Sequence, residues 1–146
     1  MIREPGEGLV RSQSGSTAIE FAFVAPLLVM FMLGAVQFGT GLHANAAMRE
    51  LAGWAGRKAV VSYQNAPANR ITADQLKADI SARVSSGTYK IDAARLIADV
   101  NVVQNTSLAT VKEFRITLRY THSLSLPLMP VQTFPLRINR TFFVQN

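Results

Sequence analysis

The chain contains one long apolar run, and this run constrains the fold more than any other feature. From Phe21 to Met48 there is no formally charged side chain, and from Phe21 to Val36 no side chain can form a hydrogen bond. A helix that crosses a bilayer needs about 20 mostly apolar residues, and Ala18 to Phe38 supplies that length. We therefore expect a membrane-spanning helix. Pro26 lies inside it and lacks the N–H that would bond the carbonyl of Ala22, which predicts a kink.

A single carboxylate, Glu20, stands just before this run. Burying a charge without a partner is costly, and an acidic residue beside a membrane span is a candidate functional residue. A simpler explanation is a capping box, in which Thr17 caps the helix and Glu20 reaches back to it from three residues later. A further interpretation is a secretory signal peptide, because Ala44-Asn45-Ala46 ends the run with an A-x-A pattern and cleavage before Ala47 would release a soluble protein.

The stretch Gly15-Ser16-Thr17-Ala18-Ile19-Glu20-Phe21, followed by an apolar helix with Pro26, resembles the start of type IV prepilins. It is most similar to the TadE-like minor pilins of tight-adherence (Tad/Flp) pili. The resemblance implies a leader, residues 1–15, that a prepilin peptidase removes between Gly15 and Ser16. It also implies that Glu20 neutralises the new α-amino group of Ser16, or that of a neighbouring subunit, and that Glu20 and Phe21 serve assembly.

The same resemblance implies partners and a location. The partners are the prepilin peptidase, other major and minor pilins, the pilus assembly platform and the lipid bilayer. The protein is expected to cross the bacterial inner membrane once, with its head in the periplasm or outside, and to support pilus biogenesis and surface attachment. The alternative is a membrane-anchored or signal-peptide-exported envelope binding domain without a filament role.

Beyond the span, apolar residues continue at helical spacing as one narrow stripe. This pattern predicts a transmembrane helix with an amphipathic stalk over residues 16–62 and a globular head over residues 63–146. Asn65-Ala66-Pro67 should end the helix, because the residue before a proline avoids the helical backbone conformation. The stalk stripe consists of Ala44, Ala47, Met48, Leu51, Ala52, Ala55 and Ala59.

The head begins with a second predicted helix, since Thr72-x-x-Gln75 is a capping box and Gly87 is a stop signal. After this helix, apolar residues recur at every second position, which predicts strands. The alternation is most regular over residues 114–121 and recurs over Ala98 to Val102 and Leu136 to Val144. We therefore predict an α+β fold. It consists of the long N-terminal helix, a second helix and a small antiparallel sheet of about three strands that packs on helix.

The connection from Ser123 to Phe134 is expected to be a loop, and it is unusually apolar, with prolines throughout. Apolar residues in a loop indicate contact with a partner or a membrane surface. Alternatively, they tuck over the edge of the sheet and protect an unpaired strand. The second interpretation is slightly favoured.

Charge and residue types limit the function classes. The 146 residues carry a net charge of +6, which indicates affinity for anionic surfaces or a merely solvated basic face. Arg115 and Arg119 share one face of a strand, and with Arg137 they form a candidate contact for an anionic partner. The chain has no cysteine and two histidines, and no spacing is typical of a metal site or an activated nucleophile. We expect no enzyme activity, no metal, no cofactor and no nucleic-acid partner.

Overall fold

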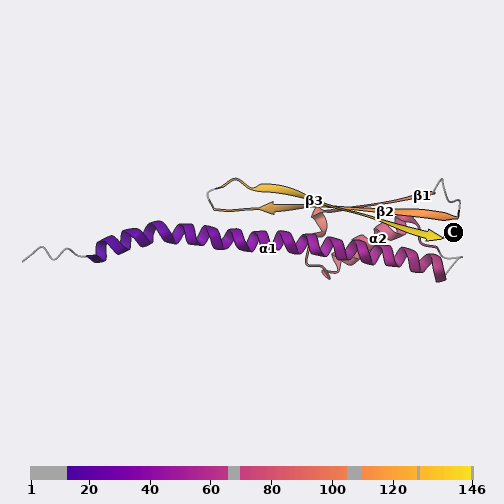
Figure 1. The fold of residues 1–146 in the computed structure, drawn as a ribbon, viewed down its shortest axis with the longest axis horizontal. Coiled ribbons are helices and arrows are strands. Elements are labelled where there is room, and N and C mark those ends of the chain that lie inside the picture. Colours follow the sequence, from indigo (N-terminus) through magenta and orange to yellow (C-terminus); the bar gives the residue numbers. More distant parts are fainter. Residues whose placement is uncertain (1–12, 66–69, 105–109, 128, 146) are drawn as a thin grey trace, which may run out of the picture.

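The computed structural model describes residues 13–65, 70–104, 110–127 and 129–145. Within these residues, two α-helices are followed by a short 3-10 helix and three strands, which confirms the predicted α+β class (Figure 1). Most of the expected leader, residues 1–12, lies outside the described residues. The elements are α1 (Gln13–Asn65), α2 (Ala73–Ser85), η2 (Ala93–Arg95), β1 (Leu96–Gln104), β2 (Val111–Leu124) and β3 (Gln132–Gln145).

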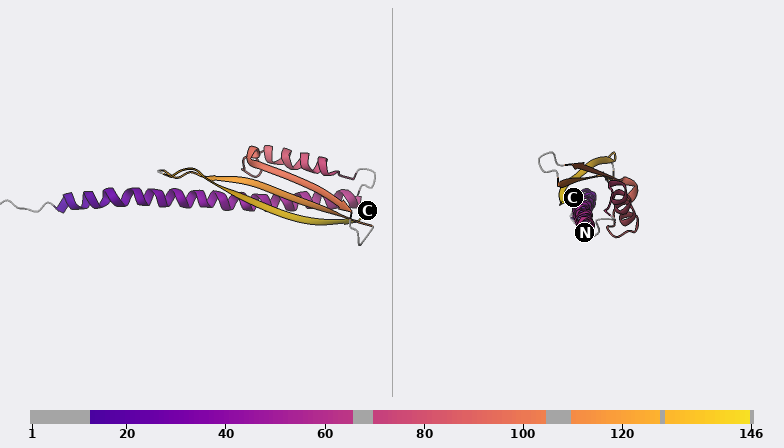
Figure 2. Two further views of the ribbon diagram at one scale, coloured as in Figure 1. Left: turned by 90° about the horizontal axis from the view of Figure 1, so that it is seen from above. Right: turned by 90° about the vertical axis from the view of Figure 1, so that its right-hand side faces the viewer.

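The head has two layers, with α1 and α2 together covering one face of the sheet (Figure 2). The sheet is antiparallel in the order β1-β2-β3, so β2 lies in the centre, and its Phe114 is opposite Val102 on β1 and Phe142 on β3. The sheet lies over the C-terminal part of α1 only, while the N-terminal part of this helix extends alone (Figure 1). The fold therefore separates a bare helix from a packed head.

Small residues on α1 allow the sheet to come close to the helix. The whole stalk stripe is buried, and the alternating residues Phe114, Ile116, Leu118 and Tyr120 of β2 belong to the same core. A close approach occurs at Gly56, where an added Cβ would collide with the ring of Phe142. Small side chains on the helix thus face large ones on the sheet, so the two layers pack closely.

The second helix begins and ends as its sequence predicts. The Thr72 hydroxyl accepts a bond from the Gln75 amide at 3.2 Å, and the Gln75 side chain accepts one from the Thr72 amide at 3.0 Å. This capping box satisfies two backbone donors that a helix start leaves open. After the helix, Gly87 adopts a positive φ of 76°, a conformation that glycine takes without steric cost.

Apolar contacts and one aromatic side chain hold α2 against the rest of the head. Leu76, Ile80 and Val84 are buried. On α1, the ring of Trp54 is half-buried, and the Arg83 guanidinium of α2 lies over it at 4.6 Å. The Lys58 ammonium lies 2.7 Å from the Asp79 carboxylate, but both side chains are well exposed. Exposed ion pairs contribute little, so packing dominates this contact.

The predicted loop from Ser123 to Phe134 is wrong in its extent. Strand β2 continues to Leu124 and β3 already begins at Gln132, with Ser123 paired to Thr133. The connection is therefore a short turn at the end of a long hairpin. Pro135 lies within β3, opposite Thr121. A proline is tolerated there because β3 is an edge strand, whose outer backbone donors need no partner.

The helix start differs from the capping-box interpretation of Thr17. Helix α1 already begins at Gln13, so Thr17 lies inside the helix instead of at its cap. The helix also continues through Pro26 without interruption. In Figure 1 the indigo end of α1 is inclined to the remainder of the helix.

Candidate functional site

The exposed apolar surface of α1 is the most unusual feature of the molecule. No residue of the most apolar window of this helix is buried inside the chain, and Phe31 is 76% exposed. Soluble proteins rarely expose apolar patches of this extent, and lipid or other apolar helices are surroundings that suit such a surface. Its large side chains are Ile19, Phe21, Phe23, Val24, Leu27, Leu28, Val29, Phe31, Met32, Leu33, Val36 and Phe38.

The residues predicted to matter for processing lie together at the free end of this helix. Gly15 and Ser16 belong to the first turns of α1. Glu20 follows on an exposed part of the helix, next to Phe21, which is 70% exposed. Pro26 is exposed as well. All of them lie on the part of α1 that the head does not cover (Figure 1), so none of these residues is required for the packing of the head.

Residues 15–57 match the family model described as "TadE-like protein". The chain is TadE-like over this segment. No curated protein and no solved structure matches the chain significantly. The resemblance seen at the start of the apolar run is thereby confirmed, and it indicates a protein associated with Tad pili.

The TadE-like segment includes both halves of α1. It begins at Gly15, contains the exposed apolar surface, and extends through most of the stalk stripe that forms the core of the head. The apolar helix and the stalk are thus one continuous unit. In this unit, Ala44 is 3% exposed and Ala47 is 5% exposed. Signal-peptide cleavage before Ala47 would remove Ala44 from the core and cut the helix under the sheet, which argues against that interpretation.

The three arginines of the candidate anionic contact lie on the uncovered face of the sheet. Arg119 on β2 is directly opposite Arg137 on β3, and Arg115 lies on the same face, because residues two apart in a strand point the same way. Arg115 forms an ion pair with Glu113 at 2.8 Å. The arginines are therefore gathered on the head, away from Gly15 and Glu20, and the two candidate sites are separate.

The structure shows two features near the end of the apolar run that the sequence analysis did not predict. The first is Gln37, whose side-chain oxygen accepts a bond from the Ser125 amide at 2.8 Å and whose amide group donates to the Ser125 carbonyl. The only sequence signal for this contact is an isolated amide at the end of the apolar run. The second is a cavity of about 370 Å³ beside it, between α1 and the hairpin. Its lining includes Phe38, Leu42, Leu124 and Phe134, together with His122.

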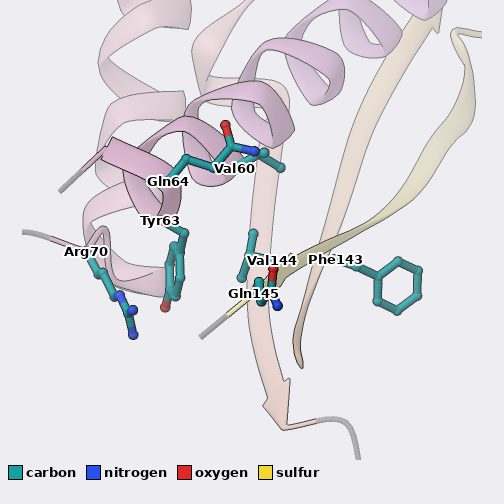
Figure 3. Close-up of a pocket in the computed structure, with 7 residues that line it drawn as sticks. All are labelled: Val60, Tyr63, Gln64, Arg70, Phe143, Val144 and Gln145. Carbon is teal, nitrogen blue, oxygen red and sulfur yellow. The ribbon is translucent and has the colours of Figure 1, made fainter. Parts of the chain in front are cut away.

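A second hollow of about 440 Å³ lies at the far end of the head, where α1 ends beside the last residues of β3 (Figure 3). In Figure 3 the side chains of Tyr63 and Arg70 lie side by side, whereas Phe143 points away from them. The Arg70 guanidinium lies 5.2 Å from the centre of the Tyr63 ring, and this ring packs edge-on against Phe114 at 5.5 Å. These contacts give Tyr63 a structural role at the end of the core.

Proposed function

We propose that this protein is a minor pilin or pilus-assembly component of a tight-adherence pilus, anchored in the bacterial inner membrane by the N-terminal part of α1. The single observation that carries the proposal is the TadE-like match over residues 15–57, which coincides with a helix whose apolar surface is bare. A prepilin peptidase removes the leader between Gly15 and Ser16. The apolar helix then passes from lipid into a bundle with the helices of other pilins, since both surroundings are apolar.

Glu20 has an electrostatic role in this proposal. Cleavage after Gly15 creates an α-amino group on Ser16, four residues from the Glu20 carboxylate. A charge enclosed among apolar helices without a partner costs several kcal/mol, and an opposite charge nearby offsets much of that penalty. Glu20 therefore allows the cleaved end to be packed into a filament, either within one subunit or between neighbours.

The N-terminus of the mature protein is the most direct test. Mass spectrometry of the protein isolated from cells should find Ser16 as the first residue. Replacing Gly15→Ala should reduce this processing, because a Cβ at the cut site hinders the approach of the backbone to the peptidase. The matched control is Gly34→Ala, since nothing lies within 4 Å of a Cβ added at Gly34. A protein that starts at Met1 would support a plain membrane anchor, and one that starts at Ala47 would support an exported soluble domain.

A second prediction concerns Glu20→Gln. The amide has nearly the same shape but cannot neutralise an amine, so the variant should be cleaved normally and yet be depleted from pili by about tenfold if the pair contributes about 1.4 kcal/mol. Immunoblots of sheared pili and of membranes measure the two fractions. Normal incorporation of the variant would contradict the pairing role. The matched control is Glu20→Asp, which keeps a carboxylate at this position and should be incorporated into pili.

The alternative function, an envelope binding domain, is favoured by one observation. Arg119 and Arg137 face each other across neighbouring strands, and like charges in this position destabilise a sheet. An anionic partner would relieve the repulsion. Under this alternative, Arg119→Gln with Arg137→Gln would abolish binding to an anionic envelope polymer, and Glu20→Gln would have no effect.

A further inference from the structure

The turn of the β2–β3 hairpin lies beside α1 at the place where the apolar span ends. Both hydrogen bonds between Gln37 and the Ser125 backbone join the hairpin to the helix there. Figure 1 shows the hairpin reaching further toward the N-terminal end of α1 than the other described parts of the head. Because Gln37 is next to Phe38, the last residue of the expected span, Ser125 at the start of the turn is at the level of the membrane surface once the helix is inserted.

This turn is apolar and exposed. Between Ser123 and Leu136 the chain has no charged residue. We define the hairpin tip as Leu126, Met129, Val131 and Phe134. Met129 is 58% exposed, Val131 60% and Phe134 50%. The side of the hairpin that faces the helix is apolar too, as the lining of the cavity shows. The tip therefore presents apolar side chains toward both the helix and its surroundings.

Two cations lie near the tip, at the same end of the head. The carbonyl of Tyr89 is 3.1 Å from the His43 ring nitrogen, which places the following residue, Lys90, roughly 8 Å beyond the end of the span along the helix axis. The Arg95 guanidinium donates to the Ser123 hydroxyl at 2.6 Å and forms an ion pair with Asp92 at 3.1 Å. Polar headgroups extend for roughly 5–8 Å beyond the hydrocarbon on each side, so these cations reach the headgroup layer.

We propose that the hairpin tip enters the lipid bilayer that α1 spans, at the boundary between headgroups and acyl chains. Apolar side chains flanked by cations are typical of elements that lie in a membrane interface, where the cations attract anionic headgroups. The covalent connection to α1 holds the tip at the surface, so binding does not require a second encounter. This inference rests on the membrane insertion of α1 in the proposed function, but on neither the cleavage nor the filament.

Because the chain has no cysteine, single labels can be introduced cleanly. The full chain is reconstituted into vesicles of phosphatidylethanolamine and phosphatidylglycerol, with a small thiol-reactive fluorophore on Met129→Cys. Control labels are on Phe31→Cys in the span and on Thr110→Cys, an exposed position at the opposite end of the sheet. Quenching is measured with lipids that carry a spin label near the headgroup, with lipids that carry one deep in the acyl chains, and with iodide in the water.

We expect lipid quenching of the Met129→Cys label to be several-fold stronger than that of the Thr110→Cys label, with weaker quenching by iodide. Equal behaviour of these two labels would overturn the inference. A Met129→Cys label protected from iodide but not quenched by lipid would also overturn it, and would indicate that protein, such as a second copy of the chain, covers the tip. An unquenched Phe31→Cys label would overturn membrane insertion itself, and this outcome distinguishes failure of the anchor from failure of the tip alone.

Discussion

Gly56 shows how one residue determines the distance between the helix and the sheet. In the middle of a helix glycine is destabilising relative to alanine by roughly 0.5–1 kcal/mol, so local preference alone would favour alanine. The ring of Phe142 occupies the space that a Cβ would need. The absence of a side chain on α1 therefore allows a large ring on β3 to complete the core.

Replacing Gly56→Ala should destabilise the head by about 1–3 kcal/mol, because the Phe142 ring must leave its position or the sheet must move away. The control is Gly53→Ala, where the nearest atom outside the helix backbone is the end of Arg57 at 4.0 Å, and this variant should be neutral or slightly stabilising. Thermal unfolding of the detergent-solubilised protein, followed by circular dichroism, measures both. Equal melting temperatures of the Gly56→Ala and Gly53→Ala variants would contradict the contact between Gly56 and Phe142. Adding Phe142→Leu to the Gly56→Ala variant should restore its stability.

At the scale of the elements, the two parts of α1 have different surroundings. Its N-terminal part carries large apolar side chains that the rest of the chain does not cover. Its C-terminal part carries the small residues of the stalk stripe and is covered by the sheet. The same helix therefore has a surface that suits a membrane at one end and forms a core element at the other. Helix α2, by contrast, is short and amphipathic, and it depends on the head for its stability, as short helices generally do.

The contact of α2 with the head should depend on packing more than on charge. Ile80 is fully buried, and Ile80→Ala should cost about 2–5 kcal/mol of unfolding free energy. Asp79→Asn removes the ion pair with Lys58, and because both side chains are exposed it should cost at most about 1 kcal/mol. Denaturant unfolding measures both variants. A larger loss for Asp79→Asn than for Ile80→Ala would show that the ion pair holds the helix.

On the scale of the whole molecule, the long helix holds the head at one end and leaves lateral surface for other helices. Small residues in apolar helices let neighbouring helices approach closely. Gly39 and Gly34 have no atom within 4 Å of an added Cβ in the single chain. These positions are thus open for contacts that only assembly would make.

In the proposed filament, Gly39→Leu should lower incorporation into pili while leaving the thermal stability of the head and the cleavage unchanged, because nothing in its own chain lies within 4 Å of a Cβ added there. The ratio of protein in sheared pili to protein in membranes measures this effect. Phe31→Leu, at an equally bare position, should incorporate normally. Full incorporation of Gly39→Leu would mean that no helix packs at this position.

Much of the fold is predictable from periodicity because periodicity is a local property. The capping box at Thr72, the stop at Gly87 and the alternation of β2 each depend on a few neighbouring residues, and the structure confirms them. The extent of the hairpin was not predictable in this way. Its prolines suggest a loop, but pairing with β2 on one side extends β3 back to Gln132, since an edge strand tolerates a proline that a central strand would not.

By itself, the sequence determined the apolar span, the order of helices and strands, and the TadE-like character of residues 15–57, because these depend on residue type and spacing along the chain. Only the tertiary structure decided which distant residues meet. The contact of Gln37 with Ser125, the position of Phe142 over Gly56 and the alignment of Arg119 with Arg137 depend on strand register, hairpin length and the distance between the layers. These quantities arise from packing the whole chain at once, and no short stretch of sequence contains them.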